Sequence, residues 1–498
     1  MSDDGLKGKK MSMMALILMI FTSVFGFANI PRGFYLMGYA AVPWYIISAI
    51  LFFIPYAFMQ AEYGAAFKNE KGGIYSWMDK SVGPKYAFIG TFMWYASYIV
   101  WMVNICSAIW IPFANAISGT DTTVNWSIFG LNSTRTLGVL GILLIIAITF
   151  IATKGLEQIT KVTSIGGTAV ALLNIVLLIG AVVVLILNGG KLAEPIVSYE
   201  SFLYSPNPAY QTTIAMLSFS VFAIFAYGGI EAVGGLVDQT ENPEVVFPKG
   251  LSIAAIIISI GYSLGVLLIG IFTNWGQTLS TKNVHLGNVA YVVMKNLGYA
   301  IGTSVGLSEA VSLNIGLWVA RFVGISMFLA LIGAFFTLSY SPLKQLIEGT
   351  PKELWPGKLS VITDGMPKNA MWVQCVIVAV FIAIVSFGGE GAAEFFEKLV
   401  LMTNVAMTLP YMFLSGAFAR FKRIENIDRP FVAYKSHASS LVATVVVTLT
   451  VLFANIFTIV EPATRGDMSS TIFMIAGPLF FTIVALVMYQ RYERKYLK

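Results

Sequence analysis

The 498-residue sequence contains few charged side chains. Asp, Glu, Lys and Arg together make up 11% of the residues, whereas hydrophobic residues make up 57%. A water-soluble chain usually carries about a quarter charged residues, so this composition excludes an ordinary soluble protein and indicates a chain surrounded by lipid. We therefore expect an all-α membrane protein of spans and short loops in contact with the bilayer.

Cysteine and histidine are also scarce, with two residues of each. Cys106 and Cys375 lie within apolar runs, which argues against a disulfide framework. His285 and His437 lie in polar connections and have no carboxylate or cysteine neighbour at ligand spacing. An enzyme would need a nucleophile, a base and an orienting group, or a metal cluster. The sequence therefore predicts no metal, no cofactor and no catalysis.

The N-terminal segment lacks the pattern of a cleavable signal peptide. Residues 1–11 are mostly polar and include Lys7, Lys9 and Lys10, and the apolar run that follows has no small-residue cleavage site. We interpret that run as the first membrane span. The net charge of +6 does not indicate nucleic-acid binding, because most basic residues lie in loops beside spans.

Apolar runs long enough to cross a bilayer, about 20 residues each, recur along the chain. We expect about twelve transmembrane helices, near residues 12–38, 42–66, 86–117, 136–153, 162–188, 211–236, 250–273, 314–342, 370–388, 396–419, 437–460 and 469–490. An even number of spans places both termini on one side. Most of the 31 Lys and Arg residues lie in loops on that side, which predicts cytoplasmic termini in the cell inner membrane.

Two connections are longer than the rest, at residues 119–135 and 274–313. The second includes a helix-like stretch, Asn288 to Leu297, that we expect to lie across the outer face. No connection could hold a soluble signalling domain. Residues 491–498 form a short basic tail, which favours a contact with lipid headgroups.

The sixth span contains a mid-membrane pair of glycines. Gly228 and Gly229 are followed within two residues by Glu231. Each glycine costs about 1 kcal/mol in a helix relative to alanine. In hydrocarbon, irregular backbone is tolerated only where it lines a cavity or is buried in protein. A broken helix is one interpretation, and close packing through small residues with a tolerated acid is the other.

The first span offers a matching interruption, five spans earlier. Pro31 removes an amide donor, and Gly26 and Asn29 are easily accommodated in irregular backbone. Paired interruptions in two halves of a chain are typical of a transporter binding site. The N-terminus of a half-helix suits a carboxylate, and freed carbonyls suit an ammonium group. The predicted partner is therefore a small amino-acid substrate.

Several short motifs then follow one another in a recognisable order. They are Ala61-Glu62, Gly72-Gly73-Ile74-Tyr75-Ser76-Trp77, Gly83, Phe88-Ile89-Gly90, Trp94, Glu241-Asn242-Pro243 and Pro248. In this order and spacing they resemble the amino acid–polyamine–organocation transporters, in the glutamate/γ-aminobutyrate antiporter branch. The resemblance covers essentially the whole chain.

The resemblance implies a five-plus-five inverted repeat with broken helices one and six, followed by two extra helices, and transport by alternating access. The first repeat would cover residues 12–188, the second residues 211–419, and the two extra spans residues 437–490.

The resemblance also implies that substrate lies between the two breaks. The candidate substrate-binding residues are Ser23, Phe25, Gly26 and Phe27 in span one, with Phe225, Ala226, Tyr227, Gly228 and Gly229 in span six. Phe225 matches an aromatic gate, Gly228 a pocket-lining residue, and Glu231 an acid that acts in gating or pH response. The family's Gly-Ser-Gly reads Val24-Phe25-Gly26 here, so Phe25 adds bulk to the common site.

An ionisable residue within a membrane span is costly and is therefore a candidate for a functional role. On this ground Glu231, and Arg321 of span eight, are candidate gating or proton-linked groups. Arg321 and Arg32 could each attract an acidic substrate. The alternative for Arg321 is pairing with carbonyls or an acid inside the bundle, and for Arg32 it is snorkelling to the outer surface. Glu62 is expected to anchor a loop. Trp94, Tyr95, Tyr98 and Tyr411 could line a vestibule or lie at the bilayer interface.

The resemblance implies an amino-acid antiporter for a substrate like glutamate or γ-aminobutyrate, and neutral amino acids stay open as substrates. A proton-coupled symporter using Glu231 stays open, as does a non-transporting sensor or partner subunit. Assembly into a homo-oligomer also stays open, because faces of small residues serve internal packing and dimer contacts equally well.

Overall fold

The computed structural model describes residues 10–497, apart from the side chains of residues 391–398 and 404. The predicted N-terminal segment 1–11 and tail 491–498 therefore lie partly outside the described residues. The described chain is built of helices, and its β-type pairing is limited to two isolated bridges, Met11 with Thr240 and Thr363 with Met366. The predicted all-α class is confirmed.

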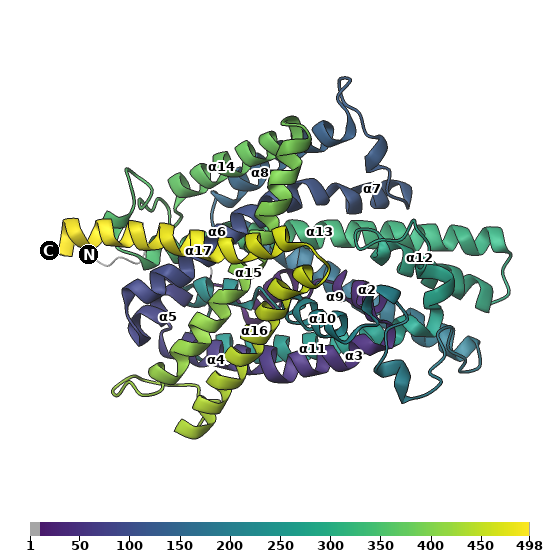
Figure 1. The fold of residues 1–498 in the computed structure, drawn as a ribbon, viewed down its shortest axis with the longest axis horizontal. Coiled ribbons are helices and arrows are strands. Elements are labelled where there is room, and N and C mark those ends of the chain that lie inside the picture. Colours follow the sequence, from purple (N-terminus) through teal and green to yellow (C-terminus); the bar gives the residue numbers. More distant parts are fainter. Residues whose placement is uncertain (1–9, 498) are drawn as a thin grey trace.

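Residues 10–497 contain seventeen α-helices, which form the body of the molecule (Figure 1). They are α1 (Met13–Val24), α2 (Asn29–Met37), α3 (Ala41–Ser48), α4 (Ile54–Ala66), α5 (Ile74–Ser81), α6 (Pro84–Ala108), α7 (Trp110–Ser118), α8 (Ser133–Ala152), α9 (Leu156–Leu187), α10 (Thr213–Ala226), α11 (Pro243–Phe272), α12 (Val289–Ser304), α13 (Glu309–Gly349), α14 (Lys368–Phe387), α15 (Glu390–Phe421), α16 (His437–Thr464) and α17 (Met468–Tyr492).

Short 3₁₀ and π-helical segments connect or interrupt them. The 3₁₀ segments are η1 (Gly38–Ala40), η3 (Thr123–Asn125), η4 (Tyr199–Phe202), η5 (Pro208–Tyr210), η6 (Ile230–Gln239) and η8 (Lys352–Leu354). The π-helical segments are η2 (Ala49–Phe53), η7 (Trp275–Leu279) and η9 (Glu493–Leu497).

Eleven helical stretches in the described chain, some of them made of several consecutive helices, are long and apolar enough to cross a membrane. The first stretch, Met13–Ala66, has 54 residues and contains two of the twelve predicted spans, which meet at η1. Gly38 makes this turn possible, because its φ of 57° lies in the left-handed region that favours glycine. The predicted series of twelve spans therefore agrees with the fold.

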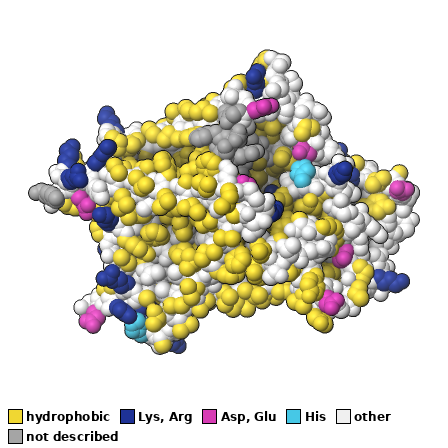
Figure 2. All heavy atoms as spheres, in the orientation of Figure 1, with side chains coloured by type: hydrophobic (Ala, Val, Ile, Leu, Met, Phe, Trp, Pro, Cys, Tyr) yellow, Lys and Arg dark blue, Asp and Glu magenta, His cyan; other side chains and the backbone are white. Residues whose placement is uncertain are grey.

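The ends of the molecule differ in charge. The described chain begins and ends at one end, which also carries α5 and which we call the terminal face; α7 and α12 lie at the other end, the opposite face (Figure 1). Figure 2 shows a broad belt of hydrophobic side chains between them, with Lys and Arg gathered beside the terminal face. An apolar belt with charged margins is the surface that a bilayer requires.

Spans one and six are broken, as predicted. The first break separates α1, which ends at Val24, from α2, which begins at Asn29. The second separates α10, which ends at Ala226, from η6. The cause differs from the prediction in one respect: Pro31 lies in the first turn of α2, where its missing amide leaves no helical bond unmade, so the break precedes it.

Two other boundaries differ from the sequence prediction. The fifth span was expected near residues 162–188, but α9 already begins at Leu156, because Gly155, with a φ of 122°, ends the connection there. The helix predicted at Asn288–Leu297 is present and longer, as α12, and it packs along the first half of α13.

Candidate functional site

A cavity of about 300 Å³ lies between the two breaks. This volume is at the lower end of the range found for small-molecule sites. It is lined by the two breaks together with residues of α6, α7, α13 and α15, and near the opposite face by Arg32, Gly287 and Tyr291. The cavity therefore has irregular backbone on two sides and apolar helix faces around the rest.

The first break offers unpaired backbone donors. The amide of Gly26 donates to Val24 O at 2.9 Å in a tight turn, but no group among the described residues accepts from the amides of Phe27 or Ala28. They stand just before α2, whose N-terminus carries the positive end of the helix dipole. Since Ala28 also lines the cavity, this wall suits a carboxylate.

The second break lies against the first. Gly229 has a φ of 111°, and a Cβ added there would lie 2.4 Å from the carbonyl oxygen of Ser23. Only glycine fits this position, because both the backbone conformation and the contact with another backbone exclude a side chain. The two glycines that the sequence singled out therefore allow the broken helices to meet.

A tyrosine of α11 joins the two breaks. The hydroxyl of Tyr262 lies 2.8 Å from Val24 O and 2.9 Å from Ala226 O, and it accepts from Asn29 Nδ2 at 3.3 Å. Its ring stacks on Tyr45 with a centroid distance of 5.2 Å. A hydroxyl has one proton, so the two carbonyls share a single donor. Tyr262 thus holds the end of α1 and the end of α10 at a fixed separation.

We expect the substitution Tyr262→Phe to weaken binding of amino acid in the cavity by about tenfold, because two carbonyls and the Asn29 amide lose a partner worth about 1–3 kcal/mol when buried. The ring stacking would remain. Equilibrium binding of labelled amino acids to the purified protein would measure this. Tyr39→Phe is the matched control, since its hydroxyl also donates to a carbonyl, that of Glu194 at 2.9 Å, outside the cavity. Equal losses in the two variants would contradict a role for Tyr262 in the site.

Glu231 lies directly behind the cavity wall and is fully buried. Its Oε1 accepts from Trp94 Nε1 at 3.0 Å and Tyr98 OH at 3.2 Å, and Tyr411 OH lies at 3.4 Å. Its Oε2 accepts from the amide of Gly229 at 3.2 Å. The carboxylate therefore fixes the second break directly, and reaches the cavity through Tyr98 and Tyr411, which both line it.

Six of the nine predicted substrate-binding residues line the cavity, namely Ser23, Gly26, Phe225, Ala226, Gly228 and Gly229. The other three do not. The ring of Phe25 packs edge-on against Phe21 and Tyr262, and the hydroxyl of Tyr227 donates to Tyr45 O at 3.1 Å. Phe27 is buried in the surrounding core. The bulk of Phe25 is thus directed into the helix packing and does not fill the common site.

The two candidate arginines lie in different surroundings. Arg321 lies outside the cavity lining; its Nε donates to Ile117 O at 3.1 Å and its Nη2 to Ser118 O at 3.3 Å. Arg321 thus pairs with backbone carbonyls, which was the alternative to attracting an acidic substrate. Arg32 does line the cavity, near the opposite face, and its Nε donates to Leu286 O at 2.8 Å.

Phe225 separates the cavity from a second one. Its side chain is 43% exposed although it lies inside the helix bundle. The neighbouring cavity, of about 380 Å³, shares Asn29, Arg32 and Phe225 with the first and extends to α16 and α17. This position between two open spaces agrees with the predicted gate role, which stays a prediction. Trp94 donates to Glu231 and Tyr95 donates to Gln374, and neither residue lines the cavity between the two breaks, where a vestibule was predicted.

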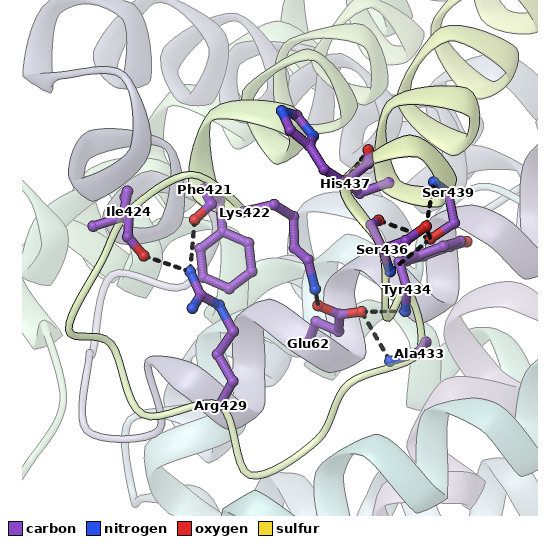
Figure 3. A network of polar contacts seen from close by, with 11 residues as sticks. Glu62, Phe421, Lys422, Ile424, Arg429, Ala433, Tyr434, Ser436, His437 and Ser439 are labelled. Atoms are coloured by element: carbon purple, nitrogen blue, oxygen red, sulfur yellow. Dashed lines mark hydrogen bonds and ion pairs between the residues drawn. The ribbon is translucent and has the colours of Figure 1, made fainter.

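Glu62 anchors the connection between α15 and α16 on the terminal face. It was expected to anchor the loop that follows its own span. Its carboxylate is fully buried at the end of α4 and pairs with Lys422 Nζ at 2.7 Å (Figure 3). The same carboxylate accepts from the amides of Ala433 and Tyr434 at 2.8 and 2.7 Å. Burial and the Glu62 charge raise the pKa of the Tyr434 hydroxyl, which stays neutral and donates to Pro55 O at 3.0 Å. The segment between α15 and α16 is thereby fixed to both ends of α4.

The sequence missed Tyr262 and Asn455 as functional candidates. Asn455, on the wall of the second cavity, accepts from Thr408 at 2.7 Å. A polar side chain within a predicted span was the available signal for both. Among the side chains that the structure describes, no group of three His, Cys, Asp or Glu gathers as a metal site would require.

Comparison with known proteins gives a consistent family. The sequence pattern of the amino acid permease family matches residues 11–486. The inner membrane transporter YjeM of Escherichia coli (strain K12) is 57% identical over 486 residues, which cover 97% of this chain and 96% of that protein.

Two more distant relatives come from Lactococcus lactis. The aspartate/glutamate permease AcaP of subsp. cremoris is 25% identical over 444 residues, which are 87% of this chain and 84% of that protein. A glutamate/gamma-aminobutyrate antiporter of subsp. lactis is 21% identical over 461 residues, which are 90% of this chain and 83% of that protein.

Proposed function

Because this chain belongs to the amino acid permease family, within the amino acid–polyamine–organocation superfamily, we propose that it exchanges one amino acid for another by alternating access. The family assignment confirms the resemblance seen in the motifs, and it makes the chain a membrane transporter of amino acids and not an enzyme. The observation that supports exchange best is the cavity between two broken helices, with free amides on one wall.

We further propose an acidic amino acid as the substrate. The described residues of the cavity lining include one cation, Arg32, and no Asp or Glu. Glu231, just behind the wall, already accepts bonds from four groups of the protein. A substrate with two carboxylates would thus meet the free amides near Ala28 and the guanidinium of Arg32. The two Lactococcus lactis relatives, an aspartate/glutamate permease and a glutamate/gamma-aminobutyrate antiporter by name, support the same class.

The proposed mechanism uses two inverted repeats, residues 12–188 and 211–419, with the extra spans at 437–490 outside them. The two breaks lie five spans apart, which supports this division. The gathering of Lys and Arg beside the terminal face (Figure 2) supports a cytoplasmic location for both termini in the inner membrane. The cavity would then face the outside in this structure, since its lining reaches Arg32, Gly287 and Tyr291 near the opposite face.

The experiment is counterflow into proteoliposomes loaded with a panel of amino acids and amines, at two pH values. We expect labelled glutamate or aspartate to enter only when a partner amino acid or amine is trapped inside. Uptake into empty vesicles, driven by a proton gradient alone, would contradict exchange. It would favour the second candidate, a proton-coupled symporter, for which the fully buried carboxyl of Glu231 is the supporting observation. If no compound crossed the membrane, the remaining interpretation would be a sensor or a partner subunit that does not transport.

A further inference from the structure

The terminal half of span six has an unusual backbone. Segment η6, Ile230–Gln239, is a 3₁₀-helix of 10 residues, although runs beyond 3–4 residues are uncommon and often mark a hinge or strain. A 3₁₀-helix has poorer internal hydrogen bonds, and buried carbonyls need donors. Eight of the ten residues of η6, from Ile230 to Val237, are buried. Any hydrogen-bond donor to their carbonyls, beyond the amides of η6 itself, must therefore come from neighbouring parts of the protein.

The last turns of α13 supply further donors to the carbonyls of η6. Ser341 Oγ donates to Ala232 O, and Lys344 Nζ donates to Gly235 O at 2.6 Å and to the carboxylate of Asp238 at 2.7 Å. Gln345 Nε2 lies 3.3 Å from Glu231 O and 3.2 Å from Ala232 O. One face of α13 thus binds η6 along most of its length.

Gln345 also binds a third segment through its other amide atom. Its Oε1 accepts from the amide of Ile74, the first residue of α5, at 2.8 Å. Gly73 precedes it with a φ of 48°, and a Cβ there would lie 2.3 Å from Gln345 Oε1. This contact gives a physical reason for the Gly-Gly pair of the sequence motif at residues 72–77. A single side chain therefore connects α5, η6 and α13.

We infer that Gln345 is a positioning residue for transport: it holds η6 and α5 against α13 and so keeps the terminal face closed. This inference rests on the proposed alternating access. Segment η6 runs from the second break to Thr240, which pairs with Met11 near the start of the described chain, and α5 lies at the terminal face (Figure 1). Both segments therefore lie between the cavity and the terminal face. Opening that face requires η6 to leave α13, and the amide of Gln345 must then release both partners together.

Two substitutions separate the contacts of Gln345. Gln345→Leu removes donor and acceptor at similar volume. Gln345→Glu keeps the acceptor for the Ile74 amide but loses the donor to η6. The matched control is Gln374→Leu, because Gln374 is also buried and makes two such bonds, to Ser339 O at 2.8 Å and from Tyr95 OH at 2.9 Å, without touching η6 or α5.

The first measurement is hydrogen exchange on the full-length protein in lipid nanodiscs. We expect Gln345→Leu to speed exchange of the amides of residues 230–239 and 74–81 by about tenfold. Gln345→Glu would speed mainly residues 230–239, and Gln374→Leu would leave both segments near the wild-type rate. Since this readout needs no flux, it tests the contact even if counterflow overturns the proposed exchange. Equal exchange in Gln345→Leu and Gln374→Leu would overturn the inference.

The second measurement is the KM for the transported amino acid on each side of the membrane. Loosening the closed terminal face lowers the population of the outward-facing state, and apparent affinity falls with that population. We expect Gln345→Leu to raise KM several-fold at the opposite face and to lower it at the terminal face. A purely structural loss would reduce the maximal rate without this opposite change on the two sides. A parallel change on both sides would therefore overturn the positioning role.

Discussion

Replacing Glu231 by glutamine is expected to slow exchange by at least about tenfold, since a buried donor left without an acceptor costs about 1–3 kcal/mol. Glutamine keeps an oxygen for Trp94 and Tyr98 but turns an NH₂ group toward the amide of Gly229, which now lies 3.2 Å from Oε2. Two donors would then face each other at the second break. Counterflow of labelled amino acid between pH 5 and pH 8 would measure both the rate and its pH dependence.

The substitution Trp94→Phe provides the comparison. It removes one donor, the indole Nε1 at 3.0 Å from Oε1, but leaves a carboxyl group that can take up a proton. We expect Trp94→Phe to keep a pH dependence that Glu231→Gln has lost, with a smaller reduction in rate. If Glu231→Gln exchanged amino acid at the wild-type rate with unchanged pH dependence, Glu231 would have no part in the mechanism.

The two breaks could be predicted from the sequence because their signals are local. Gly228 and Gly229 disfavour a helix wherever they lie, and the following Glu231 made a functional position the working hypothesis. The conformation of η6 was not predictable in the same way. Its residues would suit an α-helix as well, and the 3₁₀ form is accompanied by donors from Ser341, Lys344 and Gln345, more than a hundred positions later.

The sequence also could not predict which of the candidate residues line the cavity and which pack in the core. Ser23, Phe25 and Phe27 were predicted together as binding residues, yet only Ser23 lines the cavity. Which face of an irregular segment turns inward depends on its neighbours, here the rings of Tyr262 and Phe21 beside Phe25. The same holds for Arg321, whose carbonyl partners at Ile117 and Ser118 belong to another helix.

The second large effect is expected for Glu62→Gln. Breaking a buried ion pair by removing one partner typically costs about 3–5 kcal/mol, because the other charge stays buried without compensation. Here that charge is the ammonium of Lys422, whose side chain is only 10% exposed. We expect a clearly lower unfolding temperature, measured by thermal unfolding in nanodiscs, and faster hydrogen exchange in residues 422–436. Lys68→Gln is a suitable control, since the side chains of Lys68 and Glu244 are 31% and 35% exposed and such a pair adds little.

Double substitutions distinguish the charge of Glu62 from its role as an acceptor. Glu62→Gln combined with Lys422→Met removes both charges and keeps an oxygen for the amides of Ala433 and Tyr434, so we expect most of the stability to return. The exchanged pair, Glu62→Lys with Lys422→Glu, restores the charges but places a donor against two amides. It should therefore remain as unstable as Glu62→Gln alone. Recovery by the exchanged pair would mean that the ion pair alone fixes the connection between α15 and α16, and that the two amide bonds contribute little.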